Sequence, residues 1–161
     1  MKNLLVTFLA ICTLLSCSKQ EDLDQNQLAP KQVVFDAEKY PQKWQLVKMN
    51  GSIPNSETTG AAMEWQEYYL LNSDGTFKKL RERDGALTEV SGTYVYEDLK
   101  DGKYLILTYG ANNSLIGSCT SSELKETLWL KPGNKLWSTW SYCDGPGLEY
   151  QGENVADPAQ N

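Results

Sequence analysis

The stretch "EWQEYYLLNSDGTFKKLRERDG", Glu64 to Gly85, decides the fold class of this chain. Two runs rich in aromatic and aliphatic residues, 64–72 and 76–83, flank the turn Asn72-Ser73-Asp74-Gly75. Asp-Gly between two such runs is a strong hairpin signal, because glycine adopts a positive φ without steric cost. The stretch therefore predicts an antiparallel β-hairpin.

Similar runs lie on both sides of this hairpin. "KWQLVKMNG" predicts a first strand at about 44–49, and "KYLILTYG" predicts another at about 103–109. "ELKETLWLKPGNKLWSTWSYC" predicts a second hairpin, with Pro132-Gly133 in its turn. In the second arm of that hairpin, alternation predicts one shared face for Leu136, Trp140 and Tyr142.

The run "EVSGTYVYED" predicts a strand with a break in its middle. Alternation places Val90, Tyr94 and Tyr96 on one face and Thr93 on the other. Gly92 inside the run indicates a bend or a bulge. The small residues at 92 and 93 would also permit a void inside the fold.

Together these elements predict an all-β fold. Sequential strands joined by tight turns form an antiparallel up-and-down meander. We expect the meander to close into a small barrel of seven to eight strands, because closure removes exposed strand edges. The eighth strand would lie near 114–119 or 147–151. A short helical turn is expected only around Asp36–Lys43.

The N-terminus has the features of an export signal. Lys2 precedes the apolar run Leu4–Leu15, which is too short to span a bilayer and fits a signal peptide over 1–16. "LLSC", Leu14 to Cys17, resembles the bacterial lipobox, in which the cysteine is acylated, for example with palmitate, and becomes the mature N-terminus. The alternative is an ordinary secretory signal with an incidental cysteine at this position.

Residues 17–40 are predicted to form a flexible tether, because their polar composition cannot bury enough apolar surface to fold. The segment "SKQED" resembles surface-export signals of lipoproteins in the Bacteroidetes group; an ordinary solvated linker is the alternative. The protein is predicted to be lipid-anchored in the bacterial outer membrane, on the periplasmic face of that membrane or at the cell surface. The barrel would occupy 41–152, and 153–161 would be a disordered tail.

Charge restricts the partners of this chain. Its 161 residues, one domain in length, carry 15 Lys and Arg against 21 Asp and Glu, a net charge of −6. An acidic chain without basic stripes is a poor partner for nucleic acid or for anionic lipid. Attachment to the membrane would therefore depend on the lipid on Cys17.

The sequence offers little for catalysis. It contains no histidine, which excludes Ser-His-Asp and Cys-His catalytic sets and removes a common metal ligand. Glu64 and Glu67 have opposite parity, so they would not face one another as a glycosidase pair. "KKLRERD", Lys78 to Asp84, is interpreted as a solvated strand edge. We expect no enzyme, no cofactor and no metal site.

Two cysteines remain once Cys12 is removed with the signal and Cys17 is acylated. In an exported protein, Cys119 and Cys143 are predicted to form a disulfide, because the compartment is oxidising. Such a crosslink contributes about 3 kcal/mol in the chain-entropy model. A pair of reactive free thiols is the alternative.

Several of these motifs together are similar to a known family. "YPQKWQLVKMNG", the "WQEYYLLNSDGTF" hairpin, "GTY", an L-x-L-x-Y strand and "NKLWSTWSYCDGPGLEY" resemble the lipocalin-like lipoprotein family of the Bacteroidetes group. The resemblance covers about 40–152 together with the lipobox. It departs at Gln42, where the classical lipocalin signature has glycine. It implies a barrel with a ligand cavity.

Aromatic residues are the candidate binding groups, since buried Tyr and Trp need partners for their polar tips. We predict non-catalytic binding of a small hydrophobic or amphipathic ligand. The alternative is a filled barrel that acts as a protein- or glycan-interaction module in the envelope, with its protein partner unknown. Core packing is the competing role for each single aromatic. The candidate ligand residues are Trp65, Tyr69, Tyr94, Tyr96, Trp129 and Trp140.

Overall fold

Eight strands form a closed antiparallel barrel in the computed structural model, which describes residues 36–120 and 122–155. A ninth, very short strand, β2, pairs with the end of β1. The elements are β1 (Gln42–Asn50), β2 (Thr58–Thr59), η2 (Gly60–Ala62), β3 (Gln66–Leu71), β4 (Thr76–Arg83), β5 (Ala86–Leu99), β6 (Gly102–Tyr109), β7 (Lys125–Lys131), β8 (Lys135–Ser138), η3 (Thr139–Cys143) and β9 (Gly147–Asn154).

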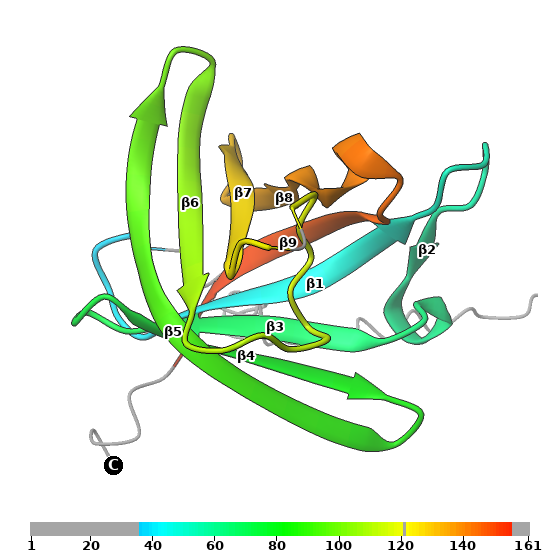
Figure 1. Ribbon diagram of the computed structural model, residues 1–161, viewed down its shortest axis with the longest axis horizontal. Coiled ribbons are helices and arrows are strands. Elements are labelled where there is room, and N and C mark those ends of the chain that lie inside the picture. The colour runs from blue at the N-terminus through cyan, green and yellow to red at the C-terminus, as the bar shows by residue number, and fades with distance from the viewer. Residues whose placement is uncertain (1–35, 121, 156–161) are drawn as a thin grey trace, which may run out of the picture. The chain divides into compact units, whose positions relative to one another are not determined.

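Each barrel strand pairs with the next one along the chain, and β9 returns to pair with β1 (Figure 1). The closing register places Trp44 opposite Gly152 and Asn50 opposite Gly147. In the β3–β4 hairpin Leu71 lies opposite Phe77, and Gly75 in the turn has a φ of 80°. The predicted up-and-down barrel and its first hairpin are therefore confirmed.

The structure decides where the eighth barrel strand lies and corrects the end of the second hairpin. The eighth barrel strand is β9, whereas 114–119 lies in the connection between β6 and β7.

Strand β8 ends at Ser138, whose side chain accepts a hydrogen bond from the Trp140 N–H at 3.1 Å. This cap starts η3. Trp140 and Tyr142 therefore lie in a 3-10 helix, and the prediction that they extend the strand is wrong.

Large side chains fill the barrel interior. Tyr94 and Tyr96 face inward against this core, whereas Val95 is 54% exposed, so the predicted facing of β5 is confirmed. Each fully buried side chain of this size contributes about 1.5–3 kcal/mol. The most deeply buried members come from most strands of the barrel: Trp44, Leu46, Tyr69, Leu71, Phe77, Leu105, Leu107, Leu128, Leu136 and Tyr150.

Gly92 lies where β5 crosses the core between Phe77 on β4 and Tyr109 on β6. The two rings meet edge to face with their centroids 5.0 Å apart. A Cβ at position 92 would lie 2.0 Å from the Thr108 carbonyl oxygen and 2.7 Å from Cε1 of Phe77. Gly92 therefore permits close packing, and the expectation that it leaves a void is wrong.

We predict that Gly92→Ala lowers the free energy of unfolding by about 1–3 kcal/mol, because the added methyl overpacks the core. Gly110→Ala is the matched control, since a Cβ there would meet nothing within 4 Å. Its effect should stay within about 0.5 kcal/mol. Urea-induced unfolding measures both variants, and equal stabilities would contradict the packing role of Gly92.

Candidate functional site

Four ionisable side chains point into the middle of the barrel. Glu67 comes from β3, Lys79 and Arg81 from β4, and Glu126 from β7. The side chains of Glu67 and Lys79 have no exposed surface, and those of Arg81 and Glu126 are 10% and 3% exposed. Two carboxylates and two cations balance one another, as buried charges must.

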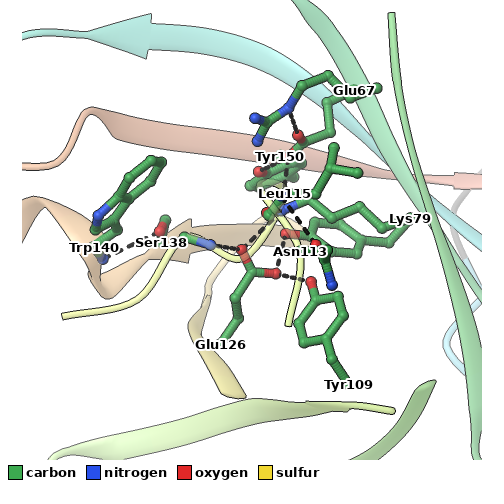
Figure 2. A network of polar contacts seen from close by, with 12 residues as sticks. Glu67, Lys79, Tyr109, Asn113, Leu115, Glu126, Ser138, Trp140 and Tyr150 are labelled. Atoms are coloured by element: carbon green, nitrogen blue, oxygen red, sulfur yellow. Dashed lines mark hydrogen bonds and ion pairs between the residues drawn. The ribbon is translucent and has the colours of Figure 1, made fainter. Parts of the chain in front are cut away.

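Lys79 joins the two carboxylates (Figure 2). Its ammonium donates to Oε1 of Glu126 at 2.7 Å and lies 3.3 Å from Oε1 of Glu67. It also donates to the Leu115 carbonyl oxygen at 2.6 Å. Arg81 donates from Nε to the second oxygen of Glu67. We call Glu67, Lys79, Arg81 and Glu126 the buried charge cluster.

Three tyrosines add hydrogen bonds to the two carboxylates of the cluster, whereas Nη2 of Arg81 has no hydrogen-bond partner among the described residues. Tyr69 donates to Oε2 of Glu126 at 2.9 Å, and Tyr109 donates to the same oxygen. Tyr150 donates to Oε1 of Glu67 at 2.6 Å. Burial raises the pKa of each phenol well above its usual value, and the carboxylates nearby raise it further. All three are therefore neutral donors at neutral pH.

The connection between β6 and β7 inserts into the barrel beside this cluster. Leu115 is buried, and the backbone N–H of Gly117 donates to Oε1 of Glu126. A Cβ on Gly117 would lie 2.7 Å from the Trp140 ring, so glycine is needed for this approach. The inserted segment and the cluster together fill the middle of the barrel.

A disulfide between Cys119 and Cys143 joins the inserted connection to the end of η3. It closes a sequence separation of 24 residues. The predicted pairing is confirmed, and the alternative of two free thiols is wrong for this structure.

The prediction that Lys78–Asp84 forms a solvated edge is also wrong. Strand β4 pairs with β3 on one side and β5 on the other. Lys78 is exposed, but Lys79 and Arg81 share the inward parity of Phe77 and are buried. These two cations are buried because Glu67, opposite Arg81 in the register, and Glu126 from β7 supply their carboxylate partners inside the barrel.

A separate cavity of about 220 Å³ lies at the end of the barrel where β1 begins. Its apolar wall contains Trp44, Tyr96 and Leu130. Lys103 stands at its rim, with its ammonium 5.7 Å from the Tyr96 ring centroid. We call this space the end cavity. The other lining residues are Ala37, Glu38, Tyr40, Gln42 and Asn134.

Gln42 organises the wall of the end cavity. Its amide donates to the Ala37 carbonyl oxygen at 2.6 Å, and its Oε1 accepts from Nε1 of Trp44 at 3.3 Å. The same oxygen accepts from the Tyr96 hydroxyl at 3.4 Å. The residue that departs from the classical lipocalin signature therefore ties the turn before β1 to the aromatic wall.

The six predicted ligand residues do not form one site. Tyr96 lines the end cavity. The Tyr94 ring packs edge to face against the Tyr96 ring, with the two centroids 5.9 Å apart. Tyr69 belongs to the hydrogen bonding of the buried charge cluster. The other three lie elsewhere: Trp65 is buried against Arg81, Trp129 lies on the outer face of β7, and Trp140 lies in η3.

The comparisons with known proteins give no family. No family model matches the chain, and no curated protein or solved structure matches it significantly. Cys17, the predicted lipidation site, lies outside the described residues. Within the described residues no helix is long and apolar enough to cross a membrane, and no three potential metal ligands are grouped. The resemblance to lipocalin-like lipoproteins therefore stays a prediction.

We predict that Lys79→Met lowers the free energy of unfolding by about 3–5 kcal/mol, because it leaves buried carboxylates without their shared cation. Lys78→Met is the matched control: the neighbouring lysine faces outward and pairs with Glu89 at 2.9 Å, with both side chains about half exposed. An exposed pair contributes less than about 1 kcal/mol. Urea-induced unfolding measures both variants, and a similar loss in each would contradict the role of Lys79.

Proposed function

We propose that this chain is an exported lipoprotein whose barrel binds a small hydrophobic or amphipathic molecule without catalysis. Acylated Cys17 would hold it at the bacterial outer membrane. The tether would end before Ala37, because Ala37, Glu38 and Tyr40 of the predicted tether line the end cavity. The signal-like N-terminus, the lipobox and the disulfide support export.

The end cavity carries the binding part of this proposal. An apolar wall with a few polar groups at the rim is the usual composition of a small-molecule site. Trp44, Tyr96 and Leu130 would cover the apolar part of a ligand, and Lys103 would meet a polar head. Each Å² of apolar surface removed from water contributes about 25 cal/mol.

The size of the end cavity restricts the ligand. Its volume of about 220 Å³ is below the range of about 300–1,000 Å³ that is usual for drug-sized ligands. The buried charge cluster and Leu115 fill the middle of the barrel, so a ligand cannot extend through it. The cavity therefore suits a small molecule or one end of an amphiphile.

A filled middle also favours the second candidate, a module that binds its partner from outside. A packed interior leaves the outer face and the loop rims for recognition. Trp137 and Tyr142, 45% and 72% exposed, supply aromatic surface there. Large exposed aromatics that lie together are typical of interaction sites.

We predict that the oxidised full chain binds octanoate and that Leu130→Phe weakens this binding about fivefold or more, because the larger ring occupies the end cavity. Leu99→Phe is the control, since Leu99 is 52% exposed and does not line the cavity. Isothermal titration calorimetry measures the affinities. Unchanged affinity in Leu130→Phe would remove the cavity from the proposal.

We predict that Cys17→Ser abolishes lipidation of the chain, because the thiol of Cys17 carries the acyl anchor. Cys12→Ser is the matched control, since that cysteine lies in the part removed. Detergent phase partition and intact-protein mass spectrometry measure the outcome. An acyl group that remains on Cys17→Ser would contradict the anchor.

A further inference from the structure

One row of side chains crosses the outer face of the barrel. Tyr104 on β6 lies opposite Trp129 on β7, and Trp129 lies opposite Trp137 on β8. Trp137 lies opposite Glu149 on β9, and Glu149 lies opposite Lys48 on β1. Five neighbouring strands thus place three aromatic rings, an acid and a base side by side.

The aromatic part of this row is ordered, and its solvent-exposed ring is Trp137, since Tyr104 is only 6% exposed. The rings of Tyr104 and Trp129 stack with centroids 5.8 Å apart and an interplanar angle of 16°. Trp137 is 45% exposed, and Tyr142, contributed by η3, is 72% exposed. An aromatic surface of this kind on the outside of a barrel with a packed interior has no part in the core, which points to a partner.

A groove of about 280 Å³ runs between this row and η3. Trp129, Trp137 and Tyr142 form its aromatic wall. Asn50 and Ser141 supply uncharged polar groups at the same groove. We call this space the outer groove. The remaining lining residues are Lys48, Ser138, Gly147, Leu148 and Glu149.

The walls of the outer groove are fixed before any ligand arrives. Ser138 caps η3, and the Thr139 hydroxyl donates to the Thr127 carbonyl oxygen at 2.9 Å. Tyr142 precedes Cys143, whose disulfide anchors the end of η3. A preorganised wall reduces the entropy lost on binding.

The charges in the outer groove satisfy one another. Lys48 lies 3.4 Å from Glu149 and 3.4 Å from Glu57, and Lys135 also binds Glu149. Although partial burial opposes it, the bond from Lys135 and the charge of Lys48 hold the pKa of Glu149 below its usual value. An ionised Glu149 keeps acceptor capacity for neutral donors such as hydroxyl groups.

These observations favour a ligand that is neutral, carries hydroxyl groups and has an apolar face. A pyranose ring has this chemistry: its C–H groups form one apolar face and its hydroxyls form a rim. The negative face of an indole attracts positively polarised C–H groups. A charged ligand would instead have to break the pairs of Lys48 and Glu149.

We propose that the outer groove is a saccharide-binding site. A neutral sugar ring packs against Trp137 and Tyr142, because the Trp129 ring is already covered by Tyr104 and by the Lys131 ammonium. The sugar hydroxyls bond to Glu149, Asn50 and Ser141. This site is distinct from the end cavity, so the two proposals stand or fall separately. A lipid-anchored protein with this groove would hold a glycan at the membrane surface.

The test titrates the oxidised full chain with cellotetraose, tetra-N-acetylchitotetraose and maltotetraose up to about 10 mM, a range that detects millimolar affinity. Saturation-transfer NMR and tryptophan fluorescence report binding. At least one oligosaccharide should bind, with an affinity that salt does not change. Trp137→Ala and Tyr142→Ala should each weaken it about tenfold.

Leu87→Ala is the control variant, since Leu87 is 68% exposed and lies outside the groove. It should bind sugar as the wild type does, and Trp137→Ala should keep wild-type octanoate affinity. Absence of binding to all three sugars would overturn the proposal. Wild-type sugar affinity in both Trp137→Ala and Tyr142→Ala would also overturn it. A sugar affinity that falls with added salt would contradict a neutral ligand, and loss of sugar binding in Leu130→Phe alone would place the sugar in the end cavity instead.

Discussion

The ammonium of Lys79, held between Glu67 and Glu126, is the interaction on which the rest of the barrel depends. It ties β4 to β3 and β7, and its bond to the Leu115 carbonyl oxygen brings the β6–β7 connection into the interior. A buried charge is costly unless it is paired and hydrogen-bonded, so these partners are required together. Among the described residues this ionic centre fills the middle of the barrel, so the two binding sites that we propose lie at its end and on its outer surface.

A short series of contacts connects the buried charge cluster to the outer groove. Glu126 accepts from the Gly117 N–H, and the disulfide of Cys119 links that connection to Cys143 beside Tyr142. The aromatic wall of the groove is therefore held by the segment that also closes the barrel interior. This arrangement explains why η3 leaves the sheet at Ser138, where a hydroxyl cap replaces continued strand pairing.

Local signals account for what could be predicted. The Asp74-Gly75 turn, the alternation in β5 and the limited number of cysteines led to the hairpin, the shared face of Tyr94 and Tyr96, and the disulfide. Each depends on residues close in the chain or on a choice among very few partners. The end of β8 was missed because a strand and a 3-10 turn share the same aromatic composition, and only the cap at Ser138 separates them.

The sequence by itself determined the all-β class, the order of the strands and the shared face of Tyr94 and Tyr96, because alternation and turn chemistry are properties of neighbouring residues. Only the tertiary structure decided that Glu67 and Glu126 meet the buried cations of β4, since the two acids are 59 positions apart and reach one another through barrel closure. The tertiary structure also decided that the six candidate aromatic residues lie in different places: in the core, at the end cavity and on the outer face. The physical reason is that parity sets which side of a strand a side chain occupies, whereas the register across several strands sets what it meets there.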